Sequence, residues 1–98
     1  MKGRFVLRPR AQADLDEIWD YTADRWGLDQ AETYTRRLWK DIRTLADNPT
    51  LGRECNEVRP GYRHYPSGSH VRFYRLADDG IDVVRILHER IDYERHIP

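Results

Sequence analysis

Residues 9–47 read PRAQADLDEIWDYTADRWGLDQAETYTRRLWKDIRTLAD, and the prediction of the fold starts from the pattern in this segment. Apolar side chains recur in it every three or four residues, in two successive stripes, which predicts two amphipathic helices. The first stripe consists of Ala11, Leu15, Ile18, Trp19, Thr22 and Trp26, and the second of Ala31, Tyr34, Leu38, Ile42 and Leu45. Each helix would be roughly 25–30 Å long at about 1.5 Å per residue.

The ends of both helices are marked by residues with special backbone properties. Pro9 suits the first turn of a helix, where its missing N–H costs nothing, and Gly27 can end the first helix in a left-handed conformation. Asp29 with Glu32 resembles a capping box for the second helix, although Asp replaces the usual Ser or Thr. That helix should end before Asn48-Pro49, because proline cannot continue a helix. The link between the helices is about two residues, so we expect an antiparallel helical hairpin.

Segments typical of β-strands lie on both sides of this hairpin. Alternating polarity, or enrichment in β-branched residues, predicts strands at residues 4–7, 58–65, 70–76 and 81–87. Pro60-Gly61 interrupts the second of these and suggests a bulge or an edge position, whereas the apolar last one should lie inside the sheet. Ser67-Gly68 and Asp79-Gly80 predict the turns between the later strands. The tail from His88 onward fits either a strand extension or a frayed helical turn.

The order of these elements, β-α-α-β-β-β, predicts the fold class. Sequential strands joined by tight turns imply an antiparallel sheet, and the helical hairpin would pack on one face of it, which makes an α+β two-layer domain. The chain has 98 residues, of which 39% are apolar and 11% aromatic. That is enough for one small domain spanning residues 1–98, and too aromatic for a disordered segment.

Composition also indicates a compartment. No apolar run approaches the ~20 residues that span a bilayer, and the basic start of the chain lacks the apolar region of a secretory signal. Cys55 is the only cysteine, which excludes an internal disulfide framework and a cysteine-based metal cage. We therefore expect a cytoplasmic protein without membrane contact.

Charge is balanced overall but unevenly distributed. The chain has 17 basic and 17 acidic residues, which argues against a protein that coats nucleic acid through its overall field. Residues 59–75 contain arginines and histidines but no acid, whereas acids gather earlier in the chain. Asp16, Asp20 and Asp24 recur every four residues away from the apolar stripe, as on a solvated helix face.

Common catalytic and metal-binding motifs are missing from the sequence. Ser67 and Ser69 fit turn positions, since neither lies in a G-x-S-x-G elbow. Cys55 precedes His64 without an evident third group, so we expect an inert thiol. The four histidines form no H-E-x-x-H pattern and no glycine-rich phosphate loop occurs, so we expect neither a metal nor a cofactor.

Arginine and histidine alternate with tyrosine on the predicted strands. The set comprises Arg59, Arg63, His64, His70, Arg72, Tyr74, Arg75, Arg85, His88 and Arg90. Such side chains can bind RNA phosphates and stack on bases, or they can bind an acidic partner peptide. A plain solvated sheet face is a third interpretation, and spacing alone does not choose among the three.

Five blocks of the sequence together resemble the ParE toxins of the RelE/ParE superfamily. They are LRPxAxxDLxxIWxY at residues 7–21, QAExY at 30–34, EVRPGYR at 57–63, FYR at 73–75 and VRILHxRxD at 84–92. Each block is weak alone, but their order and spacing cover nearly the whole chain. The resemblance implies the compact α+β toxin fold, in agreement with the order of elements predicted above.

The resemblance also implies a function and two partners. A ParE-like chain would be the toxin of a bacterial type II toxin–antitoxin pair, neutralised by a ParD-like antitoxin in a hetero-oligomeric complex. Its target would be DNA gyrase, so that replication is blocked without catalysis by the toxin itself. Repression of the shared operon would belong to the antitoxin, so no sequence-specific DNA binding is expected of this chain.

RelE relatives instead cut messenger RNA on the ribosome, and one position separates the two activities. RelE-like ribonucleases tend to carry, after a glycine in the penultimate strand, the pattern tyrosine-arginine-apolar-apolar-tyrosine, and this arginine helps to stabilise charge at the scissile phosphate. Here Gly68 is followed by His70-Val71-Arg72-Phe73-Tyr74. Val71 falls at that position here, which favours the gyrase poison over the ribonuclease. If the alignment shifts by one residue, Arg72 takes the position, and the alternative ribonuclease site would comprise Arg72, Arg85, His88 and Arg90.

The surface that binds the antitoxin can be predicted in outline. Trp26 at the tip of the hairpin and Trp39 at the border of the second stripe are candidate anchors for a partner helix, unless all three tryptophans belong to the core. Basic side chains of the strands would suit acidic residues of an antitoxin tail. The candidates are Arg63, Arg72, Arg75 and Arg85.

Overall fold

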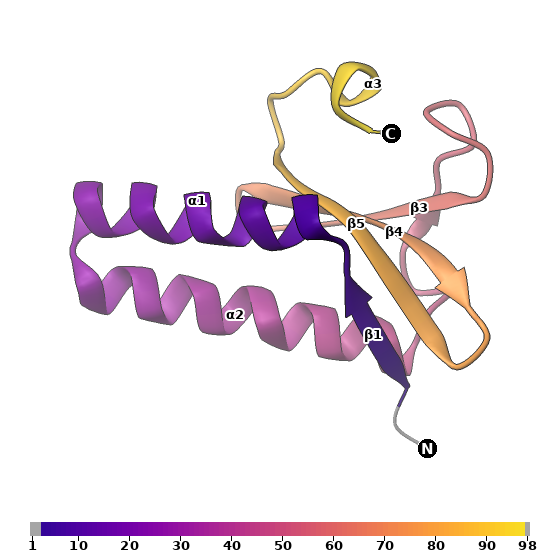
Figure 1. Ribbon diagram of the computed structural model, residues 1–98, viewed down its shortest axis with the longest axis horizontal. Coiled ribbons are helices and arrows are strands. Elements are labelled where there is room, and N and C mark those ends of the chain that lie inside the picture. Colours follow the sequence, from indigo (N-terminus) through magenta and orange to yellow (C-terminus); the bar gives the residue numbers. More distant parts are fainter. Residues whose placement is uncertain (1–2, 98) are drawn as a thin grey trace.

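Two antiparallel helices cover one face of a five-stranded sheet in the computed structural model, which describes residues 3–97 (Figure 1). Helix α1 runs Pro9–Trp26 and helix α2 runs Leu28–Asp47, so both end where the sequence predicted. Gly27 alone links them, with a φ of 96° that favours glycine. The link is therefore shorter than expected, and with a ψ of 168° Gly27 does not have the expected left-handed helical conformation.

The predicted capping box of the second helix is wrong. Asp29 lies inside the first turn of α2, because the helix begins directly after Gly27. Within residues 3–97, α2 has no side-chain hydrogen bond at its N-cap. A one-residue link leaves no position before the helix for the capping side chain, so the negative charge of Asp29 acts near the N-terminus through the helix dipole alone.

The sheet has the strand order β1-β5-β4-β3-β2. Its strands are β1 (Arg4–Leu7), β2 (Arg53–Glu54), β3 (Tyr62–Ser67), β4 (His70–Ala77) and β5 (Gly80–His88). Strand β1 pairs with β5 in parallel, whereas the other neighbours are antiparallel. The α+β class and the interior place of β5 are thus confirmed, but the sheet is mixed rather than purely antiparallel.

Two strand boundaries differ from the sequence prediction for local reasons. Strand β3 begins at Tyr62 rather than Val58, because the preceding residues turn: the Tyr62 amide donates to the Arg59 carbonyl, and Gly61 has a φ of 82°. Strand β5 begins at Gly80, where a Cβ would lie 1.7 Å from the Arg4 carbonyl oxygen. Only glycine lets β1 approach β5 so closely.

Each face of the sheet carries its own apolar cluster. The helix-side cluster consists of Ala11, Leu15, Ile18, Leu38, Ile42, Leu45, Ala46, Tyr74, Ile81, Val83 and Ile86. The cluster on the opposite face consists of Cys55, Val71, Phe73, Leu87 and Ile97. It is covered by the loop before β3 and by the tail, which forms the short helix α3 (Tyr93–His96). Of the two predictions for the tail, the helical turn is therefore confirmed, and Ile97 directly after it is buried.

The second cluster covers only part of the opposite face. In Figure 1, α3 lies over the C-terminal end of β5, far from the turn between β4 and β5. Val6 and Arg75, which belong to the uncovered part, are exposed. None of the helices within residues 3–97 has the length and apolar character needed to cross a membrane.

Candidate functional site

Arg85 lies in the interior, where its guanidinium joins α1, β5 and α3. Its Nε and Nη2 atoms donate to the Asp14 carboxylate at 2.8 and 2.9 Å, and Nη1 donates to the His96 carbonyl at 2.8 Å. The same carboxylate accepts a hydrogen bond from the Ile86 amide at 2.9 Å. Ile86 lies in the part of β5 that follows the residues paired with β1. The hydrogen bonds that Arg85 donates to the Asp14 carboxylate raise the pKa of Arg85. The side chains of Asp14 and Arg85 therefore make their hydrogen bonds within the protein.

Arg72 is also buried, on the helix side of the sheet. Its Nη2 atom lies 3.0 Å from the Asp41 carboxylate of α2, and Nη1 donates to the Ser67 and His70 carbonyls at 3.0 and 3.1 Å. Burial lowers the pKa of Arg72, and the Asp41 charge opposes this. The residue has no exposed surface, so we do not include it among direct antitoxin contacts.

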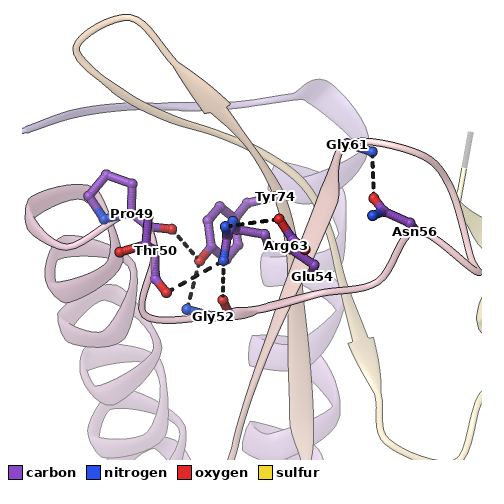
Figure 2. Close-up of polar contacts among 8 residues, drawn as sticks. All are labelled: Pro49, Thr50, Gly52, Glu54, Asn56, Gly61, Arg63 and Tyr74. Atoms are coloured by element: carbon purple, nitrogen blue, oxygen red, sulfur yellow. Dashed lines mark hydrogen bonds and ion pairs between the residues drawn. The ribbon is translucent and has the colours of Figure 1, made fainter.

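Arg63 contacts the loop between α2 and β2, as Figure 2 shows. Its Nη1 atom donates to the Gly52 carbonyl at 2.7 Å, and Nη2 lies 3.4 Å from the Glu54 carboxylate. The Tyr74 hydroxyl holds the same loop, donating to the Pro49 carbonyl at 2.7 Å and accepting the Gly52 amide at 2.9 Å. Only 17% of the Arg63 side chain is exposed, so its main contacts are internal.

A pocket of about 500 Å³ lies between α1, the end of β5 and α3. His70 and His88 line it from opposed positions on β4 and β5, with their ring centroids 5.5 Å apart. Burial lowers the pKa of His70 to about 4, and the positive charges of His88 and Arg72 add to the shift. His70 is therefore neutral at pH 7, and its Nδ1 lies 2.6 Å from the Tyr34 hydroxyl.

The four residues of the ribonuclease alternative are not gathered in one open site. Arg85 and His88 share the pocket, but Arg72 is not among its lining residues. Arg90 is exposed after the end of β5, and its backbone amide, not its side chain, contacts His88. Arg72 and Arg85 both bind carboxylates of their own chain, so neither guanidinium is free to offset phosphate charge.

The predicted tryptophan anchors differ in exposure. Trp26 is 65% exposed at the hairpin tip, beside the exposed Leu28, so the alternative that all tryptophans are core is wrong. Trp39 is 37% exposed and packs against Phe5, with ring centroids 5.9 Å apart. Tyr21 adds exposed aromatic surface on α1. Large apolar side chains thus face solvent at the tip, as Val6, Leu51 and Leu76 do elsewhere on the surface.

Arg75 is the one predicted arginine that is fully on the surface. It projects from the uncovered part of the sheet, with its guanidinium 5.8 Å from the centre of the Tyr62 ring. The sequence therefore predicted four arginines as a common surface, but the structure brings Arg63, Arg72 and Arg85 inward and leaves Arg75 outside.

The thiol of Cys55 and the possible metal ligands are the other candidates for chemistry. Cys55 is buried, and this burial raises the pKa of its thiol. The negative charge of Glu57 raises that pKa further, so the thiol form prevails at neutral pH. In the part of the chain that the structure describes, no group of three histidine, cysteine or acidic side chains is placed to hold a metal ion.

Asp14 and Asp41 are the ion-pair partners of Arg85 and Arg72 that the sequence analysis missed. Each interrupts an apolar stripe: Asp14 lies between Ala11 and Ile18, and Asp41 has the same position between Leu38 and Leu45. A carboxylate on a buried helix face requires a charged or hydrogen-bonding partner. That signal, read together with arginines in apolar strands, predicts both ion pairs.

Comparisons with known proteins agree with this geometry. The family described as "ParE toxin of type II toxin-antitoxin system, parDE" matches residues 5–93. Toxin ParE1 of Mycobacterium tuberculosis is 55% identical over 98 residues, covering 99% of this chain and 100% of that protein. Toxin ParE1 of Caulobacter vibrioides is 42% identical over 93 residues, covering 95% of this chain and 96% of that protein.

A solved structure extends the agreement to the fold. It is described as the chromosomal ParDE TA system from P. aeruginosa and superposes with a TM-score of 0.75 at 22% identity. The match covers 89% of this chain and 96% of that chain, so the helical hairpin on the sheet is common to both. The chain therefore belongs to the family of ParE toxins of type II toxin–antitoxin systems.

Proposed function

We propose that this protein poisons DNA gyrase by binding to it, without catalysis of its own, and that a ParD-like antitoxin neutralises it. One observation carries the choice of binding over catalysis: Arg72 and Arg85 are both engaged by carboxylates of their own chain. A ribonuclease needs cationic groups that are free to meet the phosphate in the transition state. Gyrase and the antitoxin would both be met in the cytoplasm.

Exposed apolar surface supports a protein that acts through a large interface. Tyr21, Trp26 and Leu28 are exposed on the helical hairpin, although side chains of this kind are normally buried. Aromatic residues of this size act as anchors at protein interfaces. We therefore keep Trp26 and Arg75 as contact residues, with Trp39 and Arg63 contributing smaller exposed areas, and assign Arg72 and Arg85 to the scaffold.

Two assays on one toxin preparation test the proposal. The first measures supercoiling by DNA gyrase, and the second measures ribosome-dependent cleavage of messenger RNA. We expect the purified protein to inhibit supercoiling and to stabilise cleaved DNA, and to leave translated messages intact. Cleaved messages together with normal supercoiling would establish the ribonuclease instead.

The antitoxin partner is tested separately. A small ribbon-helix-helix protein encoded beside this chain should bind it and restore supercoiling. The Trp26→Ala variant should bind that antitoxin more weakly, with Asp20→Ala on the solvated face of the same helix as a matched control. Equal affinities for both variants would remove Trp26 from the interface.

A further inference from the structure

We propose that a pocket on the uncovered part of the sheet binds an acidic segment of the antitoxin, with one apolar side chain of that segment on the pocket floor. The pocket has a volume of about 270 Å³ and is lined by Arg8, Pro9, Arg10, Tyr62, Arg75 and Val84. It lies on the face opposite the helical hairpin. This inference rests on the proposed function, because it assigns a second contact surface to the same partner.

The strand register places the pocket at the end of a row across the sheet. Val6 pairs with Asp82, Asp82 with Arg75, and Arg75 with Tyr62, so the four side chains lie on one face of β1, β5, β4 and β3. The adjacent residues Phe5, Ile81 and Val83 belong to or pack on the helix-side cluster, which assigns this row to the opposite face. The start of α1 supplies the remaining wall.

The cationic groups around the pocket exceed the anionic ones. Arg8 lies 3.7 Å from the Asp82 carboxylate, with about half of its side chain exposed. Arg10 and Arg75 are exposed and have no ion pair among residues 3–97. The Arg75 guanidinium lies 5.8 Å from the centre of the Tyr62 ring, a cation–π contact that does not neutralise its charge. Three guanidinium groups therefore line the pocket, and among the residues of the row described above Asp82 supplies the carboxylate.

The floor of the pocket is apolar, which favours a protein segment over a nucleic acid. Val84 is 3% exposed, Tyr62 is half-buried, and Pro9 adds a third apolar surface. An apolar floor inside a cationic rim matches a peptide that carries carboxylates on both sides of an apolar side chain. A nucleic acid backbone would gain nothing from that floor, and it would meet the Asp82 carboxylate in the row and a chain of zero net charge.

Charge reversal at the two unpaired arginines tests the pocket. The variants are Arg10→Glu, Arg75→Glu and the double variant, and the matched control is Arg37→Glu, which reverses an exposed arginine on α2. Affinity for the full-length ParD-like antitoxin encoded beside this chain is measured by calorimetry at two salt concentrations. We expect each pocket variant to lose affinity on the order of tenfold or more, with a weaker salt dependence, and the control to stay within about twofold.

The outcomes separate this inference from the proposed function. A double variant that binds the antitoxin as tightly as the wild type overturns the pocket while leaving the toxin–antitoxin pair intact. A wild-type protein that binds no antitoxin overturns the pair itself. A 20-bp DNA duplex serves as the second probe, because loss of DNA affinity without loss of antitoxin affinity would make this a nucleic-acid site and refute the inference. A charge swap gives the direct test. If an antitoxin in which one acidic residue is replaced by arginine binds the Arg75→Glu variant with recovered affinity, the pocket is supported.

Discussion

Replacing Asp14 by asparagine should strongly destabilise the fold while leaving its shape intact. The Asp14 carboxylate accepts two N–H groups of Arg85 and the amide of Ile86, all within 2.8–2.9 Å. Asp14 is 6% exposed and Arg85 is 8% exposed, so water cannot replace the lost partner. The substitution keeps the side-chain volume but removes the charge that compensates a buried guanidinium.

The expected loss follows from these contacts. Removing one partner of a buried ion pair costs about 3–5 kcal/mol. The low end applies here, because an asparagine oxygen in the place of Oδ2 can keep two of the three hydrogen bonds. We therefore expect the free energy of unfolding to fall by about 3 kcal/mol, out of roughly 5–15 kcal/mol for a domain of this kind. The midpoint of thermal unfolding should fall by roughly 12–24 °C.

Urea denaturation followed by circular dichroism measures this loss. The control is Asp20→Asn, which changes an exposed carboxylate on the same helix and should stay within about 0.5 kcal/mol of the wild type. In the double variant Asp14→Leu with Arg85→Met both charges are absent, so most of the lost stability should return. The reasoning is refuted if Asp14→Asn is as stable as its control, or if the double variant is no more stable than the single one.

Three further predictions concern His70, Tyr74 and Gly80. The pKa of His70 falls from 6.5 to about 4 on folding, so the unfolded chain takes up the proton first and the free energy of unfolding should drop as pH falls through this range. Because the ring is partly solvated, we expect only about 1–2 kcal/mol, and His70→Gln should flatten the slope in urea titrations between these pH values. Tyr74→Phe removes the hydroxyl that bonds Pro49 and Gly52, which should cost about 1–3 kcal/mol and speed amide exchange at Gly52; unchanged exchange would contradict the role of the hydroxyl. Gly80→Ala places a Cβ 1.7 Å from the Arg4 carbonyl oxygen, so β1 must move, and the free energy of unfolding should fall by about 2–4 kcal/mol in the same denaturation assay. Gly61→Ala is the comparison, because its Cβ meets no neighbouring atom and the substitution is strained only by the positive φ.

The sequence predicts the elements of this fold better than it predicts their polar contacts. Periodicity locates α1 and α2 because the buried stripe of each helix is long and regular. Strand β2 escapes prediction because two residues carry no period, and it forms only by pairing with β3. The parallel pairing of β1 with β5 joins segments more than 70 residues apart, and no local pattern reports it.

The candidate site is harder to predict because arginine has two opposite uses. Arg72 and Arg75 lie three residues apart in one basic segment, yet the first is fully buried and the second is exposed. Residue type alone favours exposure for both, since arginine is rarely buried unless it is paired. The discriminating signal is on the helices, where Asp14 and Asp41 stand in apolar stripes and require buried cations.

The two ion pairs have one role in common, which connects the scaffold to the surfaces that bind partners. Arg85 with Asp14 ties α1 to β5, and Arg72 with Asp41 ties α2 to β4, so each helix is joined to the sheet by one buried pair. Buried pairs contribute little net stability compared with apolar side chains of the same volume, but they tolerate only one geometry. We therefore expect the two pairs to fix the hairpin relative to the sheet, and with it the distance from the exposed tip at Trp26 to the opposite face. A variant with both charges of the first pair replaced by apolar side chains should accordingly fold well and still bind the antitoxin more weakly than the wild type.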